Sequence, residues 1–219
     1  METRYRAPVH ARLGRGQRRP HHGAQRGRRP AETSPPTPPA AAHVGVGSER
    51  NTANVAFILA DLYEDSEFTE PWQQPRDAGY PTTVVGRRHG VDLKGKNGHS
   101  TTADQAIADV RVDDFDALVI PGGYSPDKLR INEGMVEFTR EFVQSGKPVA
   151  AICHAGWMLA EVVVVRDRRL TSVRNIRTDL VNAGADWVDQ EVVVDGNLIT
   201  SRTPADLRPF CDALLEQLM

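Results

Sequence analysis

A cysteine and a histidine stand together where an apolar run ends. The run Pro148–Ile152 has the composition of a buried strand, and Cys153-His154 follow it directly, before a helix expected from Ala155 to about Glu161. A strand that turns straight into a helix forms a sharp elbow that holds a nucleophile over the sheet. The helix N-terminus lowers a thiol pKa. Cys153 is therefore the candidate nucleophile, and the alternative is a buried, inert thiol.

A carboxyl group, that of Glu64, follows the first apolar run, Val55–Ala60, after a short loop. In a doubly wound sheet the first and central strands lie close, so this carboxyl can reach Cys153. A protonated carboxyl would donate a hydrogen bond to a thiolate, and an ionised one would accept the thiol proton. The alternative is an acid that serves the helix N-terminus, although Asp65-Ser66-Glu67 already supply that role.

Two glycines, Gly122 and Gly123, come after the apolar run Ala117–Ile120. Glycines let the backbone approach a ligand closely and direct its N–H groups at it. The N–H groups of Gly123 and His154 together would form an oxyanion hole. A tight turn explains the pair equally well.

The ring of His154 could act as a base if a carboxylate oriented it. Asp127 is the acid nearest in sequence to the Gly-Gly turn, and it could act within the chain or across a subunit boundary. The alternative for His154 is a packed or interface histidine.

No metal site is expected, because His89, His99, His154 and Cys153 lack a known ligand spacing. No dinucleotide or phosphate-loop motif is present, and no cofactor is expected.

The elements that must position these residues alternate between strand and helix. Near-continuous apolar runs are typical of parallel strands that are covered on both faces. Helix-length amphipathic segments separate them, which predicts a doubly wound α/β fold. The expected strands are Val55–Ala60, Thr82–Val85, Ala117–Ile120 and Pro148–Ile152, followed by a hairpin of Glu191–Val194 and Leu198–Ser201. The expected helices run from about Ser66 to Gly79, through Met135 to Val143, and from Pro204 to Leu218.

The composition divides the chain of 219 residues into two parts. Residues 1–53 are rich in Arg and Pro and poor in large apolar residues, so a disordered tail is expected. It could be a solvated or wrongly included upstream stretch, a basic arm for nucleic acid, or a targeting peptide. The net charge is −2 overall and about +7 in residues 1–50, which leaves about −9 for the rest. This acidic balance argues against a core that binds nucleic acid.

Two cysteines, Cys153 and Cys211, are too few for a disulfide framework, and Cys211 lies on the apolar stripe of the last expected helix. No apolar stretch is long enough to span a membrane. A reducing, cytoplasmic setting with no membrane partner is therefore expected.

Residues 54–219 resemble the PfpI-like intracellular protease family of the ThiJ/PfpI superfamily, a class I glutamine amidotransferase-like domain. The resemblance implies a flavodoxin-like three-layer sandwich with a mostly parallel central sheet and a C-terminal β-hairpin. It also implies an elbow at Cys153, a bond from Glu64 to this cysteine, and His154 as the adjacent histidine. Family members that are assigned as peptidases complete a Cys-His-Glu triad with an acid from a neighbouring subunit, and Asp127 falls at that position. The motifs that carry the resemblance are Tyr63–Glu67, Asp116–Gly123, Lys147–His154, Asp179–Ala185, Trp187–Asp189 and Val193–Asn197.

Three functions follow from this resemblance. In the first, Cys153 attacks a reactive aldehyde such as methylglyoxal, or its adduct on a protein or peptide, and Glu64 moves the proton; this is deglycase or glutathione-independent glyoxalase chemistry in stress defence. In the second, a homo-oligomer, dimer or hexamer, acts as a cysteine peptidase. In the third, the protein is a stress chaperone or a redox sensor in which Cys153 is oxidised to a sulfinate.

Overall fold

A computed structural model describes residues 53–219, and its centre is a seven-stranded sheet. The tail expected over residues 1–53 lies outside the described residues, except for Ala53. All neighbouring strands pair in parallel except the hairpin of β10 and β11. In spatial order the strands are β10 (Val192–Asp195), β11 (Leu198–Ser201), β7 (Val149–Ile152), β6 (Ala117–Ile120), β1 (Val55–Ile58), β2 (Thr82–Gly86) and β5 (Gln105–Ala106).

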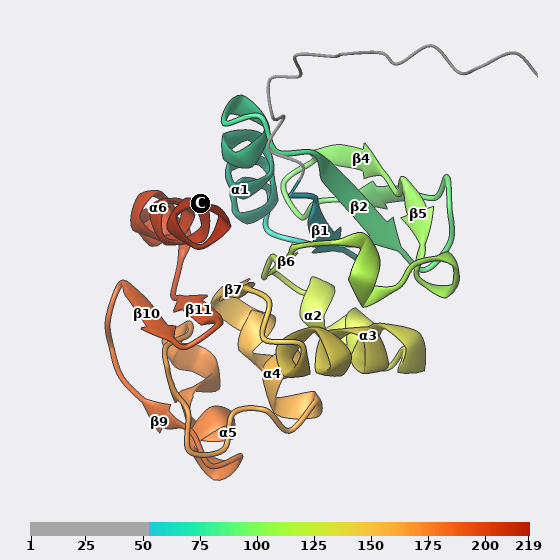
Figure 1. Ribbon diagram of the computed structural model, residues 1–219. Coiled ribbons are helices and arrows are strands. Elements are labelled where there is room, and N and C mark those ends of the chain that lie inside the picture. Colours follow the sequence, from blue (N-terminus) through green and yellow to red (C-terminus); the bar gives the residue numbers. More distant parts are fainter. Residues whose placement is uncertain (1–52) are drawn as a thin grey trace, which may run out of the picture. The chain divides into compact units, whose positions relative to one another are not determined.

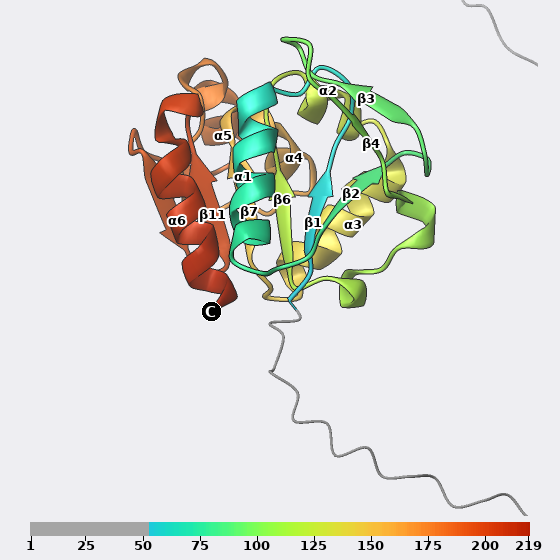
Figure 2. The ribbon, with the colours of Figure 1, turned by 90° about the horizontal axis from the view of Figure 1, so that it is seen from above.

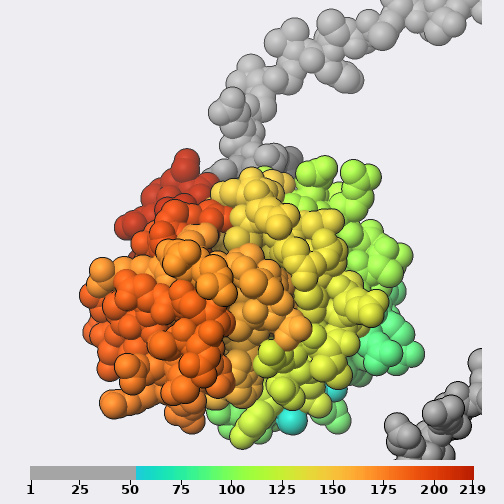
Figure 3. Space-filling model, turned by 90° about the horizontal axis from the view of Figure 1, so that it is seen from below, coloured from blue at the N-terminus to red at the C-terminus, as the bar shows by residue number. Residues whose placement is uncertain are grey.

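Helices cover both faces of this sheet (Figure 1), and α1 and α6 lie together on one of them (Figure 2). Figure 3 looks onto the opposite face, which residues of the α3 to α5 region cover in yellow and orange. The helices are α1 (Asp65–Asp77), α2 (Ser125–Leu129), α3 (Glu133–Gln144), α4 (Gly156–Glu161), α5 (Arg177–Asn182) and α6 (Leu207–Leu218).

The alternation of side chains along β1 divides the core into two halves. Ala56 and Ile58 pack with apolar residues of α3, α4 and α5, whereas Val55 and Phe57 pack with those of α1 and α6. All four strand residues are fully buried. The three-layer α/β fold with its antiparallel C-terminal hairpin, as predicted, is confirmed by this arrangement.

Two short sheets were not expected from the apolar runs. The strands β3 (Asp92–Lys94) and β4 (Ser100–Thr102) form an antiparallel hairpin, and β8 (Arg169–Leu170) pairs in parallel with β9 (Asp186–Trp187). These strands have two or three residues each and carry exposed polar side chains, so they show no apolar run. The β3–β4 hairpin matters for the site, because its turn lies against the start of α1.

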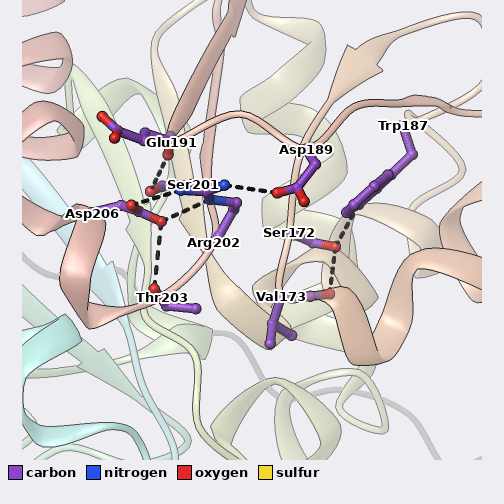
Figure 4. Close-up of polar contacts among 9 residues, drawn as sticks. All are labelled: Ser172, Val173, Trp187, Asp189, Glu191, Ser201, Arg202, Thr203 and Asp206. Atoms are coloured by element: carbon purple, nitrogen blue, oxygen red, sulfur yellow. Dashed lines mark hydrogen bonds and ion pairs between the residues drawn. The ribbon is translucent and has the colours of Figure 1, made fainter.

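An arginine after β11 ties the carboxyl end of this strand to its surroundings (Figure 4). Arg202 donates two hydrogen bonds of 3.0 Å to the carboxylate of Asp206 and one of 2.7 Å to Asp189. The Asp206 carboxylate is buried, so it depends on these donors. Because Ser201 pairs with Ile152, this network stands beside the strand end that carries Cys153.

Replacement of this arginine should destabilise the protein. Arg202→Met would leave the buried Asp206 carboxylate without its two guanidinium donors, and we expect the free energy of unfolding to fall by about 2–4 kcal/mol. Urea denaturation measures the difference. Arg208→Met, an exposed change on α6, should stay within about 0.5 kcal/mol of wild type. Equal losses in both variants would contradict the role of the network.

Candidate active site

Cys153 lies at a strained turn between β7 and α4. The residue has φ = +62°, in the left-handed region that side chains other than glycine rarely adopt, and it begins a single turn of 3-10 helix, Cys153–Ala155. Such a conformation costs about 1 kcal/mol or more, and the buried strand before it holds it in place. The side chain is 9% exposed. Cys153 therefore forms the expected elbow, with its sulfur fixed over the carboxyl end of the sheet.

Two backbone N–H groups are directed at this sulfur. They belong to His154 and Gly123, and both act to lower the pKa of the Cys153 thiol. Gly123 has φ = +71° and pairs with Tyr63 in an isolated antiparallel bridge, which fixes its N–H. The structure therefore brings together the two donors that the sequence pointed to.

The carboxyl group against Cys153 is that of Glu67, not that of Glu64. Glu67 is completely buried on α1, and its carboxyl lies close enough to the Cys153 side chain for each group to act on the pKa of the other. Its Oε2 also accepts a hydrogen bond of 3.0 Å from the Gly122 N–H. The partner expected for the cysteine, Glu64, is therefore replaced by the residue a turn further into the helix, which lies against Cys153, and Glu64 itself makes its polar contacts with the β3–β4 turn. The physical reason is that the helix turns the side chain of its third residue, rather than that of its N-cap, toward the sheet.

Gly122 makes this contact possible. A Cβ atom at this position would lie 2.5 Å from Glu67 Oε2 and 2.7 Å from Cys153 Cβ, closer than atoms can approach. Any larger residue would push the carboxyl and the thiol apart. The glycine is required for close approach of two side chains, in addition to the backbone role expected from sequence.

Glu67 and Cys153 behave as one titrating pair. Burial raises the pKa of the Glu67 carboxyl to about 7. Burial and then the adjacent Glu67 charge raise the pKa of the Cys153 thiol to about 12, against the two N–H groups that lower it. Within residues 53–219 no N–H or O–H group reaches the buried Glu67 Oε1, which also favours a protonated carboxyl. Above about pH 7 the pair therefore carries one negative charge and one proton between them.

His154 lies beside the pair. Its Nδ1 is 3.3 Å from Cys153 Sγ, and its half-buried ring packs near Trp157, with 5.1 Å between ring centroids. Burial and the charge of Lys96 lower the pKa of His154, so the ring is neutral at pH 7. A neutral imidazole at this distance can accept a proton from the thiol or from a bound substrate.

Asp127 is exposed on α2 and makes no hydrogen bond or ion pair with any residue from 53 to 219. A single chain therefore does not pair it with His154. Its participation from a second copy of the chain stays a prediction.

Glu64 has a different task, because it holds Lys96. The two side chains form an ion pair, and Glu64 Oε1 also accepts a hydrogen bond of 3.1 Å from Asn97 Nδ2. Asp65 fixes the same β3–β4 turn by accepting hydrogen bonds from the N–H groups of Asn97 and His99, at 2.9 and 2.7 Å. The turn places the ammonium group of Lys96 where its charge acts on Glu67, Cys153 and His154.

Sequence reasoning missed Glu67 and Lys96. A signal for Glu67 was present, since Glu67, Pro71 and Pro75 recur at intervals of four and all three are buried on one face of α1. A carboxyl on the buried stripe of a helix indicates a special role. Lys96 gives no such signal, because a lysine in a polar turn is ordinary.

Among residues 53–219, no group of three or more His, Cys, Asp or Glu side chains is placed to hold a metal ion. The helices of this part of the chain are also too short or too polar to span a membrane.

The raised pKa of Glu67 predicts a pH-dependent stability. The folded protein holds a proton on Glu67 that the unfolded chain releases near pH 4.5, so this stabilising contribution is complete below pH 4.5 and is lost as the pH rises through about 7. Glu67→Gln does not titrate. We expect its free energy of unfolding, relative to wild type, to gain about 3 kcal/mol between pH 4 and pH 8.

Chemical denaturation over this pH range measures the gain. Glu64→Gln is the control: it removes a carboxylate three residues earlier, and its free energy of unfolding relative to wild type should change little between pH 4 and pH 8. A constant difference between Glu67→Gln and wild type at every pH would show that Glu67 is not the buried acid.

Lys96 should set the pH at which Cys153 becomes reactive. The charged and titratable groups around this thiol are Glu67 on α1, Lys96 at the β3–β4 turn and His154 on the elbow, and Glu64 at the N-cap of α1 pairs with Lys96. Lys96→Met removes the cation that favours negative charge on the pair. We expect the midpoint of the alkylation rate of Cys153 by iodoacetamide to move up by about 0.5–1 pH unit.

Lys94→Met is the matched control, since Lys94 is an exposed lysine of the same hairpin. Its midpoint should stay within the error of wild type. The role of Lys96 is excluded if both variants, or neither, show the shift.

The chain matches the DJ-1/PfpI family over residues 53–217. It is 49% identical over 158 residues to Protein/nucleic acid deglycase 2 of Escherichia coli, which covers 71% of this chain and 92% of that protein. It is 44% identical over 156 residues, with the same coverage, to a Bacillus subtilis protein named "Putative cysteine protease YraA".

Two solved structures show the same fold. A two-domain protein of Anabaena variabilis with DJ-1/ThiJ/PfpI-like and ferritin-like domains has a TM-score of 0.75 and 43% identity, over 76% of this chain and 48% of that one. DJ-1beta of Drosophila melanogaster has a TM-score of 0.72 and 33% identity, over 76% of this chain and 90% of that one. The match over residues 53–217, with relatives that are nearly half identical, shows that this chain belongs to the DJ-1/PfpI family.

Proposed function

We propose that this protein is a cysteine-dependent enzyme that acts on reactive α-oxoaldehydes or on their early adducts with amines, the chemistry of a deglycase. The observation that carries the proposal is the contact of Glu67 with Cys153, which places a transferable proton beside the nucleophile. The relatives named deglycases, at 49% and 44% identity, support the same chemistry.

The first step uses the shared proton. The thiolate sulfur of Cys153 adds to the aldehyde carbon, so that a C–S bond forms and the π electron pair of the carbonyl moves to its oxygen. The N–H groups of Gly123 and His154 stabilise this oxygen, and Glu67 supplies its proton. With an adduct as substrate, the amine leaves from the same carbon and takes the proton instead. Both routes give a hemithioacetal on Cys153.

The second step is an internal redox exchange. The neutral ring of His154 removes the proton from the former aldehyde carbon, and the neighbouring ketone carbon receives a proton through an enediol. The first carbon is thereby oxidised to a thioester while the second is reduced to an alcohol. Water then cleaves the thioester, which releases a 2-hydroxy acid and restores the thiol. No external oxidant or reductant is needed.

A cysteine peptidase is the second candidate, and the 3.3 Å separation of His154 Nδ1 from Cys153 Sγ favours it. This activity would need an acid to orient the histidine, and Asp127 would supply it from a second copy of the chain. Peptide cleavage would then require a homo-oligomer, whereas the aldehyde chemistry would use groups of one chain.

A panel of substrates tests the proposal. Wild type, Cys153→Ala, Glu67→Gln and Glu64→Gln are each assayed with methylglyoxal, a glycated peptide and a fluorogenic peptide. We expect Cys153→Ala to lose turnover of the first two substrates entirely. Glu67→Gln should lose about 10²-fold or more in kcat/KM because it cannot transfer a proton, and Glu64→Gln should lose far less.

Two results would count against the proposal. Full methylglyoxal turnover by Cys153→Ala would exclude the cysteine as nucleophile. Cleavage of the fluorogenic peptide alone, abolished by Asp127→Ala and dependent on assembly, would replace the aldehyde chemistry by the peptidase.

A further inference from the structure

A concave site lies at the carboxyl ends of β1 and β2. Its volume is about 540 Å³, within the range of small-molecule sites. Residues that follow β1 and β2 line one side, and the segment from α2 to the start of α3 lines the other. Because β1 adjoins β6 on one side and β2 on the other, the pocket stands beside the point where the strand order reverses. Open α/β sheets bind ligands at this kind of position.

This pocket is separate from the candidate active site. None of Cys153, Glu67, Gly122 and His154 lines it. The two pocket residues that come nearest to the candidate active site along the chain are Asp61, six residues before Glu67, and Lys128, five residues after Gly123. The mechanism proposed above uses no residue of the pocket, so the two sites can be tested independently.

Three cations surround the pocket, and one acid faces them. Arg87, Arg88 and Lys128 are exposed, and no carboxylate of residues 53–219 forms an ion pair with them. Asp61 is fixed, because its Oδ1 accepts a hydrogen bond of 2.9 Å from the Lys94 N–H. Three cations and one carboxylate leave a local charge of +2, in a part of the chain whose net charge is about −9.

The floor of the pocket is apolar. Leu59, Leu93, Leu129 and Met135 form it, each at most 5% exposed. At the rim stands Ile131, a large apolar side chain that is 84% exposed. A simple inorganic anion would neither fill this volume nor use this floor. The combination suits a ligand with a dianionic head and a flat or apolar body.

We propose that this pocket binds a small organic phosphate monoester of the size of a nucleoside 5′-monophosphate. The phosphate head, which carries about −1.5 to −2 at pH 7, matches the local charge of +2. Arg87 and Arg88 donate charge-assisted hydrogen bonds to its oxygens, and Lys128 adds a third positive charge, as arginine and lysine do at phosphate sites. The body of the ligand lies on the leucine and methionine floor, and the free oxygen of Asp61 accepts hydrogen bonds from its hydroxyl groups.

Calorimetric titration of the full chain with AMP tests the proposal. Wild type should bind AMP, and adenosine and inorganic phosphate should each bind more weakly, because each lacks one half of the ligand. Arg87→Gln/Arg88→Gln should weaken AMP binding at least about tenfold, since two charge-assisted contacts are lost. A short oligonucleotide without terminal phosphates, which carries only diesters, should compete poorly and so distinguishes a free monoester from a nucleic-acid strand.

The matched control is Arg174→Gln/Arg208→Gln, which removes two exposed arginines from elements that do not line the pocket. It should bind AMP as wild type does, and both double variants should keep methylglyoxal turnover. The proposal is overturned if AMP shows no binding at millimolar concentration, if both double variants lose affinity equally, or if adenosine binds as tightly as AMP. Loss of turnover in Cys153→Ala concerns the cysteine site and leaves this binding unaffected.

Discussion

The site depends on one contact, that of a buried carboxyl group with a buried thiol across a glycine. Glu67 comes from α1 and Cys153 from the end of β7, and Gly122 between them leaves just enough room for both. Neither acid can ionise freely in this position, because burial raises the pKa of each and the charge of one opposes that of the other. A single proton and a single negative charge are therefore shared, which is the property that a reaction with proton transfer requires.

The rest of the fold holds this contact in place. The fully buried strand β7 forces Cys153 into a left-handed conformation, and this strain is tolerated because the parallel sheet is anchored on both faces. The bridge between Tyr63 and Gly123 fixes the N–H that faces the sulfur. Lys96, held by Glu64, adds a positive charge that stabilises the anionic pair. The strained backbone at Cys153 lowers the stability of the fold, and it holds the thiol in the position that the proton transfer requires.

Much of this arrangement could be predicted from sequence, because the strong signals are local. Apolar runs located the strands β1, β6 and β7, and the position of Cys153 directly after such a run indicated the elbow. The two strand-like runs Glu191–Val194 and Leu198–Ser201 predicted the final hairpin, which β10 and β11 form. The strand order and the short strands β3 and β4 could not be predicted, since strands of three residues are too short to show a hydrophobic period.

The partner of the cysteine could not be chosen correctly for a related reason. Four consecutive positions at the start of α1 include three acids, and only the rotation of the helix decides which one points at the sheet. The turn at Lys96 is fixed by hydrogen bonds to Glu64 and Asp65, which are 32 to 34 residues away along the chain. A contact of this kind is visible only in three dimensions.

The pH dependence of kcat/KM for methylglyoxal, measured for wild type and for Glu67→Gln, tests the central claim most directly. The shared proton predicts that the wild-type profile contains an ionisation near pH 7 and that this ionisation is absent from the profile of Glu67→Gln. An unchanged ionisation near pH 7 in Glu67→Gln would contradict the account, because the proton would then belong to another group.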